Sequence, residues 1–293
     1  MRKNCVSKSS LLSSLLLLLL SACYEPVEGC LDITATNFQV DADEPCPDNC
    51  CTYPSIKLAI DHCYEIATDS FVTLNYGDSI YIDGVGNPFR INGIQFYLSE
   101  FQIVSTTGAP FGVQDSLEVE QIDPINGDTT LVTLEDNFLL LNPVVKNVNI
   151  TLGENRTVGN FSGIRFKLGL DMPANYTNPS SLNDNHPLAL QNDNMYASPE
   201  EGYIFYKVGL FDGIGVEDTI PKITEIIGAN NLREVELATP FTIDEGFDVT
   251  ISIRIDYEDW FKSLDIIECL QTGTLEEKIV ENIAQSFSVI EVE

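Results

Sequence analysis

Short runs of alternating or continuous apolar residues, separated by Gly, Asn, Asp and Pro, fill most of the chain after residue 70. Aromatic and β-branched residues dominate these runs, and such side chains suit the pleated, half-buried surface of a sheet. Strands are predicted at 71–76, 79–83, 93–98, 117–122, 130–134, 145–152, 161–170, 202–210, 233–238 and 247–255. Many short strands with regular turn signals favour an all-β fold, a β-sandwich, over a parallel α/β sheet.

Near the C-terminus, the spacing of apolar residues changes from that of a strand to that of a helix. Apolar residues at Leu275, Ile279, Val280, Ile283 and Phe287 follow a helical spacing. Thr274 precedes them as a predicted N-cap, and two glutamates in the first turn suit the positive end of the helix dipole. A helical turn is also expected at 256–262, where the single tryptophan, Trp260, lies in a packed turn. The predicted fold is therefore a β-sandwich with a C-terminal helix.

The first 22 residues have the form of a lipoprotein signal peptide. A basic start is followed by an apolar stretch at 11–20 and by Leu20-Ser21-Ala22-Cys23, which predicts cleavage before Cys23 and acylation of that residue. The apolar stretch is too short to span a bilayer. Several acyl chains on one residue give stable anchoring. We therefore expect a membrane-anchored protein of the cell envelope, at the outer membrane.

Charge narrows the choice of partner. Cleavage of residues 1–22 would leave 12 basic and 45 acidic residues, a net charge of 12 − 45 = −33. A chain this acidic repels nucleic acid, so nucleic-acid binding is excluded. With 44% hydrophobic residues the chain can still bury a core. The acidic surface is either solvated or binds divalent cations.

Besides the acylated Cys23, six cysteines remain in the mature chain, and five of them lie within residues 30–63. An even number in an oxidising compartment predicts up to three disulfides and no free thiol. The crowding predicts a small cysteine-rich, acidic module at 23–66, followed by the sandwich at 67–293. The six are Cys30, Cys46, Cys50, Cys51, Cys63 and Cys269.

Residues 29–53 resemble a short cysteine motif of exported Bacteroidota proteins, G-C-x-D-x-x-A-x-N-[YF]-x-x-x-A followed by C-x-Y. The resemblance implies a disulfide between Cys30 and Cys51 and leaves the partners of the other four cysteines open. Acidic residues inside the loop offer oxygen ligands for Ca²⁺, with a solvated loop as the alternative. A zinc site made by two loop cysteines with His62 and Cys63 is a further alternative. The calcium candidates are Asp41, Asp43, Glu44 and Asp48, and the loop cysteines of the zinc alternative are Cys46 and Cys50.

Two other segments resemble the MbnP-like family of secreted β-proteins, named for a copper-binding periplasmic protein. The segment 89–99 reads F-R-I-N-G-I-Q-F-Y-L-S and is similar to the core of an early hairpin in that family. The segment 186–207 contains His186-Pro-Leu, Met195-Tyr and Gly202-Tyr-x-Phe-x-Lys, as the family's loop and following strand do. The resemblance extends over about residues 68–293 and implies a β-sandwich.

The resemblance also implies a copper site, for which His186 and Met195 are the candidate ligands because copper prefers imidazole and thioether donors. The sequence departs from the family at three places: Ala197 and Pro199 replace tryptophans, and Ile226 replaces a histidine. No nucleophile elbow, P-loop or dinucleotide motif is present, which argues against an enzyme. We therefore predict a binding module with a degenerate copper motif and an envelope protein as partner. The alternative is a copper-handling lipoprotein that uses His186 and Met195.

Overall fold

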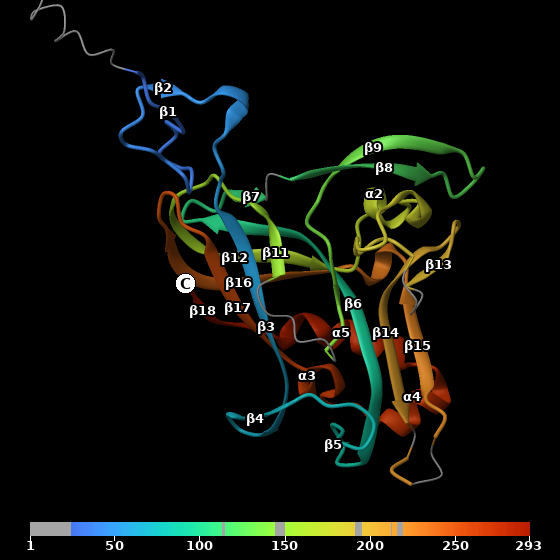
Figure 1. Cartoon of the computed structure of the whole chain (residues 1–293). Coiled ribbons are helices and arrows are strands. Elements are labelled where there is room, and N and C mark those ends of the chain that lie inside the picture. Colours follow the sequence, from blue (N-terminus) through green and yellow to red (C-terminus); the bar gives the residue numbers. More distant parts are fainter. Residues whose placement is uncertain (1–24, 113–114, 144–149, 191–194, 212, 216–218) are drawn as a thin grey trace, which may run out of the picture.

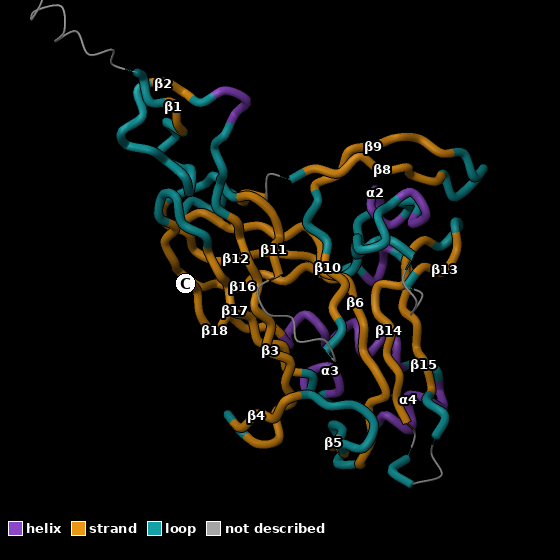
Figure 2. Tube along the Cα trace, in the orientation of Figure 1, coloured by secondary structure: helices purple, strands orange, loops and turns teal. Residues whose placement is uncertain are grey.

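The computed structural model describes residues 25–293 except 113–114, 144–149, 191–194, 212 and 216–218. The predicted all-β fold is confirmed: strands form the body of the molecule, and the helices near the C-terminus pack at one side of it (Figures 1 and 2). The predicted signal peptide and Cys23 lie outside the described residues. None of the helices in the described part of the chain has the length and apolar character that a membrane crossing needs.

The larger sheet is organised around β6 (Pro88–Ser105), the longest strand. Its central order is β13-β14-β6-β12-β16, and four short strands extend it. The central strands are β13 (Tyr196–Ser198), β14 (Gly202–Phe211), β12 (Gly159–Leu168) and β16 (Arg233–Ile243); the short ones are β5 (Ile80–Ile82), β7 (Pro110–Gly112), β10 (Leu139–Leu141) and β15 (Lys222–Ile227). Almost every side chain of β14 is buried, which explains its nearly continuous apolar sequence.

The smaller sheet has the order β11-β3-β17-β18, with β4 beside β3. Its strands are β3 (Ser55–Ala67), β4 (Ser70–Thr73), β11 (Ile150–Glu154), β17 (Val249–Asp256) and β18 (Phe287–Val292). β3 pairs in parallel with β17, from Ile56 opposite Val249 to Cys63 opposite Asp256. The sheet therefore begins at Ser55, and the boundary predicted at 66/67 falls inside a strand of the sandwich.

The helical segments follow β17 and close one side of the core. They are α3 (Glu258–Phe261), α4 (Ile266–Thr272), α5 (Leu275–Asn282) and the 3-10 turn η4 (Ile283–Ser286). The predicted C-terminal helix is thus shorter than expected, because Phe287 begins β18 and is buried there against Phe166, at 5.2 Å between ring centroids. Thr274 occupies the N-cap position of α5, but its side chain makes no capping hydrogen bond.

A hairpin, a short helix and three 3-10 turns lie outside the two main sheets. The hairpin of β8 (Ser116–Ile122) and β9 (Thr129–Glu135) extends over α2 (Met172–Asn175) (Figure 1). A bridge between Gln121 and Thr177 joins the hairpin to the segment that follows α2. Short 3-10 turns occur at Pro47–Asn49 (η1), Pro179–Ser181 (η2) and Ala229–Asn231 (η3).

The N-terminal module, residues 25–54, is mostly loop and projects from one end of the sandwich, opposite the end that carries β4 and β5 (Figures 1 and 2). Its two short strands, β1 (Glu28–Gly29) and β2 (Glu44–Pro45), pair in parallel. Disulfides join Cys30 to Cys51, as the resemblance implied, and Cys46 to Cys50. A module this small has few buried side chains, so the disulfides supply much of its stability.

The prediction of no free thiol is wrong in the structure, because Cys63 and Cys269 are free and buried. Cys63 lies in β3, where its thiol points to the carbonyl oxygen of Ile255 at 3.5 Å, whereas Cys269 lies in α4. The zinc alternative is wrong as well, since Cys46 and Cys50 are bonded to each other and have no thiolate to offer. Burial, followed by the nearby Asp256 and Asp61 carboxylates, raises the pKa of the Cys63 thiol to about 12.

These thiols give a first testable prediction. Iodoacetamide should leave the folded, unreduced protein unmodified, because thiolates react and buried, protonated thiols do not. After unfolding in denaturant without reductant, mass spectrometry should find carbamidomethyl groups on Cys63 and Cys269 alone. Modification of Cys46 or Cys50 under those conditions would contradict the disulfide pairing.

Candidate functional site

His186 lies in a tight turn that the surrounding backbone fixes. Its N–H donates to the carbonyl oxygen of Asn183 at 2.8 Å, and its own carbonyl oxygen accepts from the N–H of Ala189 at 2.9 Å. The imidazole Nδ1 accepts from the N–H of Leu188 at 3.1 Å. Because Nδ1 is an acceptor, the proton of the neutral ring is on Nε2, which donates to Oδ1 of Asp136 at 3.1 Å. Only 11% of the side chain is exposed.

Two tyrosines hold the Pro-Leu part of the same turn against the sheet. The Tyr97 hydroxyl of β6 donates to the carbonyl oxygen of Pro187 at 3.2 Å, and the Tyr203 hydroxyl of β14 donates to that of Leu188 at 2.5 Å. The two rings contact each other edge to face at 5.6 Å. Burial raises the pKa of both hydroxyls, so they remain protonated donors. The His-Pro-Leu and Gly-Tyr segments, which resemble two motifs of the family, therefore contact each other in the fold.

Gly202 is required at the start of β14 for a geometric reason. Its φ is +77°, and a Cβ at this position would lie 2.4 Å from the carbonyl oxygen of Asn175. This close approach lets the N–H of Tyr203 donate to Oδ1 of Asn175 at 2.9 Å. The glycine of the Gly-Tyr motif therefore positions Tyr203, whose hydroxyl holds the His186 turn.

A cavity of about 480 Å³ opens beside His186. Its polar lining comes from Asp115, Asp136, Asn183, Asn185 and His186. Its apolar wall is formed by residues of β10 and β11 and by Phe138, whose ring lies 6.3 Å from the imidazole. The cavity offers carboxylate and amide oxygens, whereas the imidazole N–H is already donated to Asp136.

The arrangement does not fit the expected copper ligands. Nδ1 of His186 already accepts from a backbone N–H, so the neutral ring has no free nitrogen lone pair for a metal. Met195 is 2% exposed and packs in the hydrophobic core, outside the lining of the cavity. Ile226, at the position of the family's histidine, is a fully buried core residue.

The calcium candidates do not converge either. Asp41, Asp43, Glu44 and Asp48 are all exposed. The Oδ2 atom of Asp43 accepts from the N–H of Val27 at 3.1 Å, so this carboxylate fastens the start of the module. In the described part of the chain, no group of three or more His, Cys, Asp or Glu side chains is arranged to hold a metal ion.

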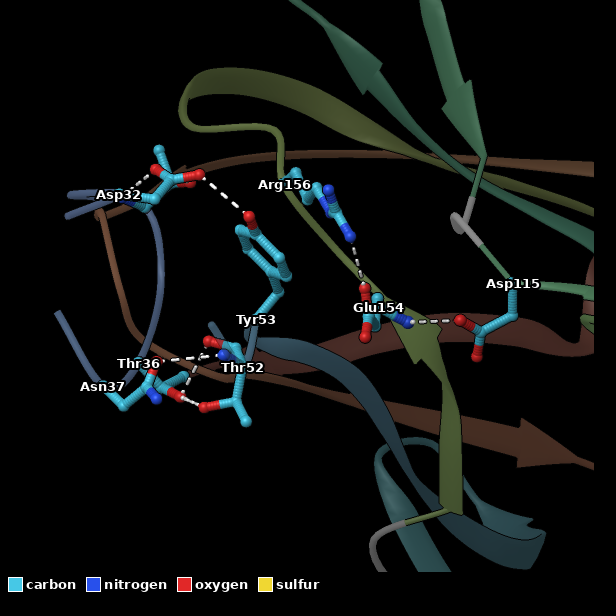
Figure 3. A network of polar contacts seen from close by, with 9 residues as sticks. Asp32, Thr36, Asn37, Thr52, Tyr53, Asp115, Glu154 and Arg156 are labelled. Carbon is cyan, nitrogen blue, oxygen red and sulfur yellow. Dashed lines mark hydrogen bonds and ion pairs between the residues drawn. The ribbon is translucent and has the colours of Figure 1, made fainter. Parts of the chain in front are cut away.

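A polar network instead joins the N-terminal module to the sandwich (Figure 3). The Tyr53 hydroxyl donates to Oδ2 of Asp32 at 3.0 Å, and the Arg156 guanidinium lies 3.6 Å above the Tyr53 ring. Arg156 also pairs with Glu154 at 3.1 Å, and the N–H of Glu154 donates to Oδ1 of Asp115 at 3.4 Å. Hydrogen bonds from Thr34 and Tyr53 lower the pKa of Asp32.

Sequence reasoning missed the residues that decide these contacts. Asp136, Tyr97, Asn175 and Arg156 carry no motif of their own and meet their partners only through the fold. Tyr97 was inside a recognised segment, 89–99, but its hydroxyl gave no signal of a partner 90 residues away.

Comparison with known proteins gives a consistent result. A family model described as MbnP matches residues 54–277. Among solved structures, MbnP from Methylosinus trichosporium is similar with 14% sequence identity and a TM-score of 0.38, covering 73% of this chain and 78% of that one. No curated protein matches the chain.

Proposed function

Because the chain belongs to the MbnP family, we propose that it is a lipid-anchored protein of the outer membrane whose sandwich binds another envelope protein. The observation that carries this proposal is the hydrogen bonding of the His186 imidazole. Both of its ring nitrogens make hydrogen bonds within the chain, so the imidazole fixes the turn and its neighbours. The His186 turn, which the family resemblance assigns to copper, is held here by hydrogen bonds within the chain.

The surroundings of His62 and Cys63, which are neighbours in β3, support a role without catalysis. The pKa of the Cys63 thiol is raised to about 12, so the group is a poor nucleophile. The neighbouring imidazole of His62 is buried and contacts the Tyr257 hydroxyl through Nδ1 at 2.9 Å. The pair therefore lacks a thiolate, and burial lowers the pKa of its imidazole to about 4, so this imidazole is too weak a base to activate a nucleophile.

Copper handling through His186 and Met195 is the second candidate function. The cavity beside His186, with Asp136 in its lining, is the observation that favours it. Binding there would require the imidazole to give up its bond to the Leu188 N–H or to release its Nε2 proton. Copper would supply Lewis acidity or electron transfer when bound, and His186 would be the residue to hold it.

A titration separates the two candidates. We expect the oxidised, purified protein to bind Cu(I) no more tightly than its His186→Ala variant when both compete anaerobically with a chelator. A Met172→Leu variant is the matched control for thioether binding at an exposed site, because Met172 is 54% exposed and is not among the residues of the core. Stoichiometric copper that the wild type retains and the His186→Ala variant loses would establish the second candidate.

The lipid anchor has a direct test. Cells grown with an alkyne analogue of palmitate should label the wild type, and the Cys23→Ala variant should lose essentially all labelling, since Cys23 is the proposed acyl acceptor. A Cys63→Ala variant controls for general effects of removing a cysteine. Equal labelling of the Cys23→Ala variant would disprove the anchor.

A further inference from the structure

The chain between the proposed acylated residue and the fold is very short. Val27 is already fixed: its N–H donates to Oδ2 of Asp43 at 3.1 Å, and its carbonyl oxygen accepts from the N–H of Asp43 at 2.8 Å. Four peptide units separate Cys23 from Val27, and an extended chain spans roughly 14 Å over that length. If Cys23 carries the acyl chains, as proposed above, the N-terminal module lies directly at the membrane surface.

The module exposes apolar side chains at this end of the molecule. Five of them lie within residues 27–40 and are between 40% and 80% exposed. They are Val27, Leu31, Ile33, Phe38 and Val40. Five exposed apolar side chains in so short and polar a unit indicate a contact with a protein or a membrane. The short tether favours a membrane, because it keeps Val27, Phe38 and Val40 within reach of the bilayer interface. Leu31 and Ile33 adjoin the part of the module that packs on the sandwich, where the carbonyl oxygen of Ile33 would lie 3.8 Å from a Cβ at Gly246.

Charge indicates which kind of membrane surface fits. Residues 24–54 contain seven acidic and no basic side chains, a net charge of −7. The acidic residues are Glu25, Glu28, Asp32, Asp41, Asp43, Glu44 and Asp48. Anionic headgroups create a negative surface potential that repels such a module, whereas zwitterionic headgroups do not. The exposed apolar side chains can therefore enter only an interface without net negative charge.

We propose that the N-terminal module is a membrane-resting foot, which places its exposed apolar side chains in the interface of a zwitterionic lipid surface. The foot is fastened to the sandwich by the stacking of Arg156 on Tyr53 (Figure 3). It also packs on the turn before β17, where a Cβ at Gly246 would lie 3.2 Å from the carbonyl oxygen of Ala35. Its contact with lipid therefore orients the whole domain and turns the end with β4 and β5 away from the membrane (Figure 1).

Fluorescence quenching tests this orientation in the full-length, acylated protein. The variant Phe38→Trp places an indole on the foot, and Val40→Trp is a second choice should the first fold poorly, since Val40 is 80% exposed. Ile125→Trp, at the 93% exposed tip of the β8–β9 hairpin, is the matched control. The native Trp260 is fully buried and supplies a constant background.

In vesicles of brominated phosphatidylcholine, the indole at position 38 or 40 should lose about half or more of its emission, because interfacial residues insert about 5–10 Å. The indole at position 125 should keep its emission. Replacing half of the lipid with phosphatidylglycerol should restore most of the emission at position 38. Equal emission loss at positions 38 and 125, or none at 38, overturns the inference, and quenching that grows with phosphatidylglycerol overturns the choice of a zwitterionic surface.

Mass spectrometry of the same preparation keeps this inference separate from the anchor on which it rests. If Cys23 is acylated but the indoles at positions 38 and 40 are not quenched, the membrane contact of the N-terminal module is disproved and the anchor stands. An unmodified Cys23 in protein recovered from membranes overturns both the anchor and the foot.

Discussion

Replacing Trp260 with alanine should lower the free energy of unfolding by about 3–5 kcal/mol. Trp260 is fully buried between the large sheet and the helical segments, with the Phe96 ring at 5.3 Å and the Tyr257 ring at 5.1 Å. Its indole N–H donates to the Ser286 hydroxyl at 3.0 Å. The substitution leaves a large cavity at the centre of the core and a buried hydroxyl without its donor.

Urea unfolding followed by far-ultraviolet circular dichroism measures this loss, since the variant lacks the fluorescent reporter. Trp260→Phe should fall between wild type and Trp260→Ala, because it keeps most of the packing and loses the hydrogen bond. Ile125→Ala, at a 93% exposed position, should change stability by less than about 0.5 kcal/mol. A loss below about 1 kcal/mol for Trp260→Ala would contradict the burial of this side chain.

Acidification should destabilise the protein through His62. Burial lowers the pKa of His62 to about 4, with a small opposing effect of Asp61. In the unfolded chain the pKa returns to about 6.5, so the unfolded state binds the extra proton first as the pH falls. The contribution of the neutral ring to stability is complete above pH 6.5 and is lost between pH 6.5 and 4. A shift of this size corresponds to about 3 kcal/mol.

Comparison with a His62→Gln variant isolates this effect. The substitution removes the titrating imidazole and keeps a polar side chain near the Tyr257 hydroxyl. Buried carboxyl groups such as Asp256, whose pKa is raised by burial, titrate in both proteins and cancel in the difference. The free energy of unfolding should fall more steeply with pH in the wild type than in the variant. Parallel pH profiles would show that His62 has the same pKa in the folded and unfolded protein, and would contradict its burial as a neutral ring.

The local pattern of side chains determined where most strands lie. The stretch 161–170 became β12 (Gly159–Leu168) and 202–210 became β14 (Gly202–Phe211), because alternating or continuous apolar residues have to face a core whatever their partner. Trp260 was expected in a packed turn and is fully buried in α3. The resemblance of residues 29–53 to a cysteine motif of exported proteins also indicated the Cys30–Cys51 disulfide.

The tertiary structure decided what each element contacts. No strand was predicted at Ser55–Ala67. The parallel pairing of this segment with β17, nearly 200 residues away, removes Cys63 from the cysteine-rich module and leaves its thiol free. In the same way, His186 became a structural residue only when the fold placed Asp136 and the Tyr97 and Tyr203 hydroxyls around its turn. Periodicity records which face of a strand is buried, whereas the choice of partner depends on packing between distant segments, which no local pattern contains.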